Sequence, residues 1–162
     1  MKKLLLLLGL SVTLLLANEE LIKKLEKLGQ PYGLSKSLVA IAKIESNFGA
    51  IRVNLQDPSC GVTMIHLKFF LKRYNIPDTS FHRNKACQQL INNDELAIAE
   101  SIVILEYWKT KFCKKWGCTI SEWEKVWAAY NAGNNYNSKS GKAYAKKIKE
   151  AIVEYNKKKD KK

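Results

Sequence analysis

A glutamate at the end of a predicted helix is the residue of this sequence best placed for acid–base chemistry. Glu45 follows the apolar positions Leu38, Ile41 and Ala42, and it is followed at once by Ser46. A carboxyl group at the inner end of a buried helix is partly desolvated, which favours its neutral, proton-donating form. Such a group can protonate a weakly basic leaving oxygen as a general acid. Glu45 is therefore the candidate catalytic residue.

Two further stretches carry residues suited to binding. In the first, Gly61 lies within Cys60–Ile65 and lets the backbone approach a ligand where a helix is expected to begin. In the second, Tyr130 and Asn131 present a phenol and an amide at the end of a predicted helix. A phenol can hydrogen-bond a carboxyl group and stack on a sugar, and an amide can recognise an N-acetyl group. We expect these stretches to converge with Glu45 on one cleft.

The spacing of apolar residues predicts an all-α domain that positions these stretches. Helical periodicity covers residues 19–28, 36–46, 62–74, 84–91, 95–112, 121–129 and 142–155. The 95–112 segment is expected to be the buried central helix. Leu96, Ala99, Val103 and Tyr107 recur every three or four residues, with Ile102, Leu105 and Trp108 alongside. Irregular segments are expected at 48–60 and 133–141. There is no strand pattern, internal repeat or linker, which indicates a single domain of about six to seven helices.

The first 17 residues are typical of a secretory signal peptide. Lys2 and Lys3 precede an apolar run from Leu4 to Leu16, and Ala17 is a small residue at its border. The run is too short to span a bilayer comfortably, so cleavage is favoured over a retained anchor. We expect the mature domain to be residues 18–162, without a stable membrane anchor, in the periplasm or outside a bacterial cell.

An exported chain makes its four cysteines candidates for disulfide bonds. Cys113 and Cys118 could close a small loop, with Cys60 joined to Cys87, although the sequence leaves all three pairings and reduced thiols open. The two histidines are far from any cysteine pair at ligand spacing, so we expect no metal. Nothing in the sequence indicates a cofactor.

The strongly basic composition indicates an anionic partner. The whole chain has 28 basic and 15 acidic residues, and residues 18–162 keep 26 of the basic ones, for a net charge of +11. Nucleic acid is one such partner, but an exported protein meets cell-envelope polymers first. We therefore expect an anionic polymer of the cell envelope as the partner, and no nucleic acid.

Taken together, these motifs resemble those of the soluble lytic transglycosylase (SLT) branch of the lysozyme-like superfamily. The similarity consists of Glu45-Ser46 at a helix end, then a glycine with isoleucine four residues on, then Ala-Tyr-Asn-Ala-Gly at 129–133. It covers roughly residues 28–155. It implies a lysozyme-like fold and cleavage of the β-1,4 bond between N-acetylmuramic acid and N-acetylglucosamine in peptidoglycan, with formation of a 1,6-anhydro end.

The resemblance also implies residue roles. Glu45 would be the single catalytic acid and later the base, and Ser46 would orient Glu45 or the acetamido group of the substrate. Tyr130 would hydrogen-bond Glu45, Asn131 would lie near the N-acetyl group, and Gly61 would line the cleft. Small single-domain members open gaps for secretion, conjugation or flagellar machines, or recycle wall material, so an envelope-spanning machine is a further implied partner.

One position departs from the family pattern. The second motif usually reads Gly-Leu-Met-Gln, and here Met64 occupies the place of the glutamine. Methionine cannot make an amide contact, which motivates the alternative of a catalytically weak peptidoglycan-binding protein. Thr63 and His66 are nearby polar residues that could supply a polar contact in place of the glutamine.

The number of carboxylates separates two mechanisms. Most glycosidases use a second carboxylate, whereas substrate-assisted enzymes use the acetamido oxygen of the substrate. Asp57 is the nearby acid in this sequence, and its Asp-Pro turn favours a structural role. A muramidase-type hydrolase of the same fold is the rival reading. We expect the four tryptophans mainly in the core or packed on the Cys113–Cys118 loop.

Overall fold

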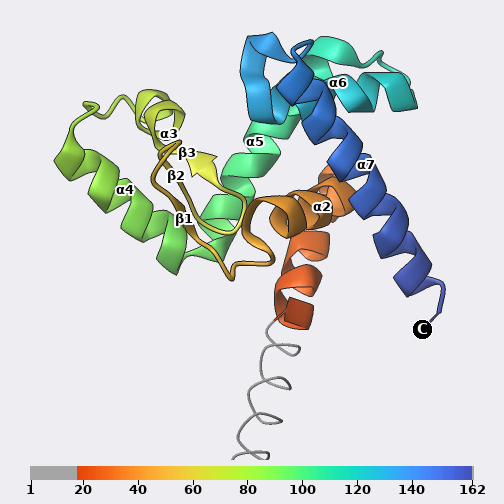
Figure 1. Ribbon diagram of the computed structural model, residues 1–162, viewed down its shortest axis with the longest axis horizontal. Coiled ribbons are helices and arrows are strands. Elements are labelled where there is room, and N and C mark those ends of the chain that lie inside the picture. The colour runs from red at the N-terminus through yellow and green to blue at the C-terminus, as the bar shows by residue number, and fades with distance from the viewer. Residues whose placement is uncertain (1–17, 162) are drawn as a thin grey trace, which may run out of the picture.

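The computed structural model describes residues 18–161, which form seven α-helices and one small sheet (Figure 1). The predicted signal segment, residues 1–17, lies outside the described residues. Residues 18–29 are helical. The other helices are α2 (Ser35–Ser46), α3 (Leu67–Arg73), α4 (Ser80–Asn92), α5 (Asp94–Phe112), α6 (Ile120–Ala132) and α7 (Lys139–Lys159), with 3₁₀ turns η1 (Gln30–Tyr32) and η2 (Gly133–Asn135). The all-α prediction is confirmed.

A short antiparallel sheet is the main departure from the predicted elements. Its strands are β1 (Val53–Asn54), β2 (Ser59–Cys60) and β3 (Ile65–His66), in the order β1-β2-β3. The helix that we predicted from residue 62 begins only at Leu67. Gly61 and Met64 adopt the left-handed region with φ of 88° and 51°, which is incompatible with a right-handed helix.

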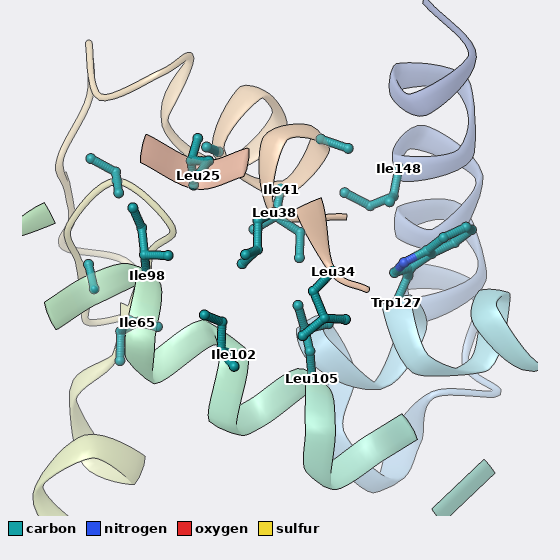
Figure 2. Close-up of a cluster of buried hydrophobic side chains, with 14 of the residues drawn as sticks. Leu25, Leu34, Leu38, Ile41, Ile65, Ile98, Ile102, Leu105, Trp127 and Ile148 are labelled. Atoms are coloured by element: carbon teal, nitrogen blue, oxygen red, sulfur yellow. The ribbon is translucent and has the colours of Figure 1, made fainter. Parts of the chain in front are cut away.

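The core gathers around α5, as predicted, and it includes Ile102, Leu105 and Trp108 of the residues expected there. Ile98, Ile102 and Leu105 of α5 point into the cluster shown in Figure 2, together with side chains of α2, α6 and α7. Val103 and Tyr107, which we expected on the buried face, are 49% and 61% exposed. The buried residues Ile98, Ile102 and Leu105 recur at helical spacing, and so do the exposed residues Val103 and Tyr107. Periodicity alone therefore did not separate the buried side chains from the exposed ones.

Two groups of elements flank the central helices. In Figure 1 the sheet, α3 and α4 lie on one side of α5, and α6 and α7 lie on the other. Helix α7 packs against both α6 and α2, while α4 packs against α3 and α5. The C-terminal end of α2 points toward the sheet (Figure 1). Glu45, near that end, is influenced by Asp57 of the β1–β2 loop and by Tyr144 of α7.

Two disulfide bonds and one buried hydrogen-bonded carboxylate fasten this arrangement. Cys60 of β2 is bonded to Cys87 of α4, and Cys113 is bonded to Cys118 in the connection between α5 and α6. Glu100, which is 3% exposed in the middle of α5, accepts a hydrogen bond of 2.6 Å from the Tyr74 hydroxyl. None of the helices formed by residues 18–161 is long and apolar enough to cross a membrane.

Candidate active site

The end of α2 holds Glu45 in a sharply terminated last turn. After Ser46 the chain leaves the helix through Asn47 and Phe48, both left-handed with φ of 49° and 56°, and then Gly49 with φ of 83°. The Phe48 N–H donates to the Ala42 carbonyl at 3.0 Å, which closes the helix end. Two consecutive non-glycine residues in this region are costly and persist only where the surroundings enforce them. The backbone that carries Glu45 is thus rigidly defined.

Ser46 helps to hold the backbone in this conformation, and its side chain does not line a cavity. Its side chain is buried, its hydroxyl donates to the Val62 carbonyl at 2.6 Å, and it accepts the Gly49 N–H at 2.8 Å. Ser46 therefore joins the end of α2 to the turn at residues 61–64. Its position allows it to orient Glu45 through the backbone, whereas contact with a substrate acetamido group would need exposure that it lacks.

Gly61 is required for packing between elements and not for approach to a ligand. It is buried, and a Cβ atom at this position would come within 2.9 Å of the Leu90 carbonyl oxygen and 3.0 Å of the Ala97 Cβ. The turn therefore rests directly on the end of α4 and the start of α5. The expected placement of Gly61 on the wall of a cleft is not what the structure shows.

Met64 completes the same turn. It is half-buried and left-handed, and its sulfur lies 3.8 Å from the Ser59 hydroxyl oxygen. The side chain thus leans against β2. The adjacent Thr63 is fully buried and donates to the Ala97 carbonyl at 3.0 Å, so it is committed to the fold and not to a ligand.

Tyr130 lies close to Glu45 but bonds elsewhere. Its hydroxyl donates to the Thr63 carbonyl at 2.9 Å and lies 2.9 Å from the Ser101 hydroxyl. The hydrogen bond from Tyr130 to Glu45 that the family resemblance implies is not formed. Burial first, and the nearby Glu45 charge second, raise the pKa of Tyr130. Tyr130 therefore connects α6 to the turn and to α5 beside the carboxyl group.

Tyr144 of α7 is the tyrosine that interacts with Glu45, and the sequence analysis did not identify it. It is 8% exposed, and its hydroxyl has no hydrogen-bond partner within normal geometry among the described residues. The hydroxyl nevertheless lies close enough to lower the pKa of Glu45. The sequence signal that could have identified Tyr144 is its position on the apolar face of α7. Ile148 and Ala151 lie on the same face, and Tyr144 is a residue with a polar hydroxyl among these aliphatic side chains.

The environment of Glu45 favours its neutral form. Burial raises its pKa above the ordinary value, and the charge of Asp57 acts in the same direction. The Tyr144 hydroxyl and the charge of Lys147 oppose this effect, with burial remaining the largest contribution. A carboxyl group in this setting keeps its proton to higher pH than a solvated glutamate, as a general acid requires.

A polar hollow of about 580 Å³ lies next to this group. Asp57, from the loop between β1 and β2, forms one wall, and its carboxylate is held by the His66 Nε2 at 3.1 Å. The other lining residues lie between the end of α6 and the start of α7, and apart from Ala132 they carry amide or hydroxyl side chains: Asn131, Asn134, Asn135, Asn137, Ser138 and Ser140. Glu45 does not itself line the hollow, but Asp57 both lines it and interacts with Glu45. Many closely spaced amides and hydroxyls suit a ligand rich in hydroxyl and acetamido groups.

A larger groove of about 870 Å³ lies between α6 and α7 and is lined mainly by lysines and glutamates. Several of these charges are paired with each other, for example Lys149 with Glu124 at 2.7 Å. It contains none of the predicted site residues. Within residues 18–161 there is no group of three or more histidine, cysteine or acidic side chains that could hold a metal ion.

Comparison of the chain with protein-family models, with curated proteins and with solved structures finds no match. The candidate site therefore rests on its own geometry. That geometry combines one desolvated carboxyl group, a buried phenol whose hydroxyl acts on it, and a polar hollow lined by the neighbouring Asp57.

Proposed function

We propose that the protein is a peptidoglycan lytic transglycosylase in which Glu45 is the single catalytic residue. The observation that carries the proposal is the Glu45 carboxyl group, desolvated at the end of α2 and faced by the buried Tyr144 hydroxyl. The polar hollow next to it supports a glycan substrate with N-acetyl groups. The resemblance of the Glu-Ser and Ala-Tyr-Asn-Ala-Gly motifs to the SLT family supports the same assignment.

The proposed reaction needs one carboxyl group in two protonation states. Glu45 donates its proton to the glycosidic oxygen while the N-acetyl carbonyl oxygen of the substrate attacks C1, so the glycosidic bond breaks and an oxazolinium ring forms. The Glu45 carboxylate then removes the proton of the C6 hydroxyl. The C6 oxygen attacks C1, the ring reopens to the acetamide, and a 1,6-anhydro sugar leaves with Glu45 protonated again. The Tyr144 hydroxyl donates to the carboxylate between the two steps.

The proposed location is the periplasm or the cell exterior. The two disulfide bonds suit an oxidising compartment. The net charge of +11 of residues 18–162 favours association with the carboxylates of peptidoglycan, and the glycan strands are the proposed partner. A secretion or flagellar machine of the envelope is a further proposed partner, motivated by the SLT resemblance alone.

The products of sacculus digestion test the proposal. Mass spectrometry of purified sacculi treated with the protein should show muropeptides that end in 1,6-anhydro-N-acetylmuramic acid. Glu45→Gln keeps the shape of the side chain but removes the acid, and we expect the release rate to fall by about 10²–10⁴-fold. If the variant released product as fast as the natural protein, the assignment of Glu45 would be wrong.

A muramidase-type hydrolase is the second candidate, and Asp57 favours it. Asp57 interacts electrostatically with Glu45 and lines the hollow, as a second carboxylate that activates water would. If the protein is a transglycosylase, the Asp57→Asn variant should still release products that end in 1,6-anhydro-N-acetylmuramic acid. For the hydrolase, the natural protein should release reducing ends, and Asp57→Asn should abolish them. Reducing ends from the natural protein would overturn the transglycosylase proposal.

A further inference from the structure

The connection between α5 and α6 presents a tryptophan to solvent on a closed loop. Cys113 and Cys118 are bonded across it, and Lys114 pairs with Gly117 as an isolated bridge, with the Gly117 N–H donating to the Lys114 carbonyl at 3.0 Å. Trp116 at the tip is 90% exposed. A large aromatic side chain held in water by a covalently closed turn indicates a contact surface and not a packing residue.

The loop is also cationic. Lys114 and Lys115 precede the tryptophan, and the Lys115 Nζ lies 5.5 Å from the centre of its ring. Ile120, which begins α6, adds a second apolar side chain that is 56% exposed. No acidic residue occurs between Cys113 and Ile120. An exposed indole beside lysines matches the interface of an anionic bilayer, where aromatic rings lie at headgroup depth and lysines pair with phosphates.

We propose that this disulfide-closed loop, residues 113–118 with Ile120, binds the surface of an anionic phospholipid bilayer. A glycan is the competing occupant, but sugar sites combine an aromatic face with amide or carboxylate partners for the hydroxyl groups. The loop has no such side chain, whereas the hollow beside Asp57 has many. Because the disulfide bond holds the turn in advance, insertion of the indole costs little ordering of the backbone.

The contact is a reversible one. One indole, one isoleucine and two lysines provide a weak, salt-sensitive attachment and not the insertion of a membrane-spanning helix. The loop follows the C-terminal end of α5, which at 19 residues is about 28 Å long, so it lies far from α4 at the other end. The inference does not depend on the proposed function, because none of its residues takes part in glycan cleavage.

Vesicle binding by the full, oxidised protein tests the inference. The probe is a phosphatidylcholine vesicle containing one third phosphatidylglycerol and brominated acyl chains, which quench a tryptophan that enters the interface. The part of the quenching due to Trp116 is the difference between the natural protein and Trp116→Phe. Replacing Lys114 and Lys115 together by alanine should weaken binding by about 20–30-fold, since each lysine near an anionic surface contributes about five-fold. Glu45→Gln should bind vesicles as the natural protein does.

A matched pair of lysines provides the control. Lys157 and Lys158, on the last turn of α7, carry the same charge away from the loop, and replacing both by alanine should weaken vesicle binding by only about two-fold. Equal losses for the two pairs would overturn the inference, because binding would then be general electrostatics. Quenching that Trp116→Phe leaves unchanged would also overturn it. So would a Trp116→Phe variant that loses affinity for sacculi but not for vesicles, which would assign the loop to glycan.

Discussion

At the scale of single residues, the burial of Glu45 should reduce the stability of the folded protein at neutral pH. Its pKa is raised in the folded state, so its contribution to stability is present at low pH and is lost as the pH rises through that pKa. Glu45→Gln removes the buried charge. We expect the variant to melt at a higher temperature than the natural protein at pH 7, with no such gain at pH 4. Calorimetry at the two pH values measures this difference, and equal melting temperatures at pH 7 would contradict it.

The two tyrosines near Glu45 should respond differently to loss of their hydroxyl groups. The Tyr144 hydroxyl lowers the pKa of Glu45, so Tyr144→Phe should raise that pKa and move the alkaline limb of kcat/KM to higher pH. The Tyr130 hydroxyl bonds Thr63 and Ser101 instead. Tyr130→Phe should therefore cost about 0.5–1.5 kcal/mol of stability and move the limb less. pH–rate profiles measure the displacement of the alkaline limb, and urea unfolding measures the loss of stability. If both variants displaced the limb equally, the assignment of Tyr144 and not Tyr130 to Glu45 would be wrong.

At the scale of elements, Ser46 is the link between α2 and the 61–64 turn. Ser46→Ala leaves the buried Val62 carbonyl without this donor, and we expect a loss of about 1–3 kcal/mol of unfolding free energy. Urea unfolding measures the loss. Ser140→Ala is the matched control because Ser140 is exposed near the start of α7, and it should change stability by less than about 0.5 kcal/mol. Similar values for both variants would show that the link contributes little.

The two disulfide bonds should contribute unequally to stability. Cys60 and Cys87 are 27 positions apart, whereas Cys113 and Cys118 are five apart. Loop-closure entropy predicts about 3.5 kcal/mol for the first bond and about 2 kcal/mol for the second. Unfolding free energies of the two double serine variants measure these contributions. A larger loss for the 113–118 pair would contradict the entropic account.

The helices could be predicted from sequence because their signals are local. The predicted span 95–112 and the observed α5, Asp94–Phe112, agree closely, and Asn93 accepts the Leu96 N–H at its start. The sheet could not be predicted, because strands of two residues contain no alternation to detect. The face of α5 was predicted only in part, because two apolar stripes overlap and the packing of α2 and α6 selects Ile102 and Leu105 over Val103 and Tyr107.

The candidate site could be predicted from sequence only in part, because local signals identify some of its residues and long-range packing decides the others. Glu45 could be found from its own surroundings in the sequence, since the helix and its glycine exit are adjacent. Tyr144 could not, because its relation to Glu45 exists only after α7 packs against α2. The competing partners of Tyr130, Ser101 and the Thr63 carbonyl, are likewise distant in sequence. Long-range packing decides which tyrosine faces the carboxyl group.

For the molecule as a whole, the net charge of +11 on residues 18–162 should make action on peptidoglycan sensitive to salt. Raising the ionic strength from about 0.05 M to 0.3 M shortens the screening length by more than half, and we expect KM for sacculi to rise at least about two-fold. Turnover of a short uncharged glycan is the matched control and should change little. A KM for sacculi that does not depend on salt would show that the charge plays no part in substrate capture.

The site is completed by the last helix of the chain. Glu45 and Tyr144 lie 99 positions apart, and the closure of so long a segment is slow compared with the formation of a helix. Until α7 docks on α2, the carboxyl group therefore lacks the Tyr144 hydroxyl that faces it in the folded protein. Under the proposed function, the capacity to cut glycan arises only at that final step. Under this proposal, a chain whose synthesis or translocation is unfinished does not yet cut the cell wall, because its active site is incomplete.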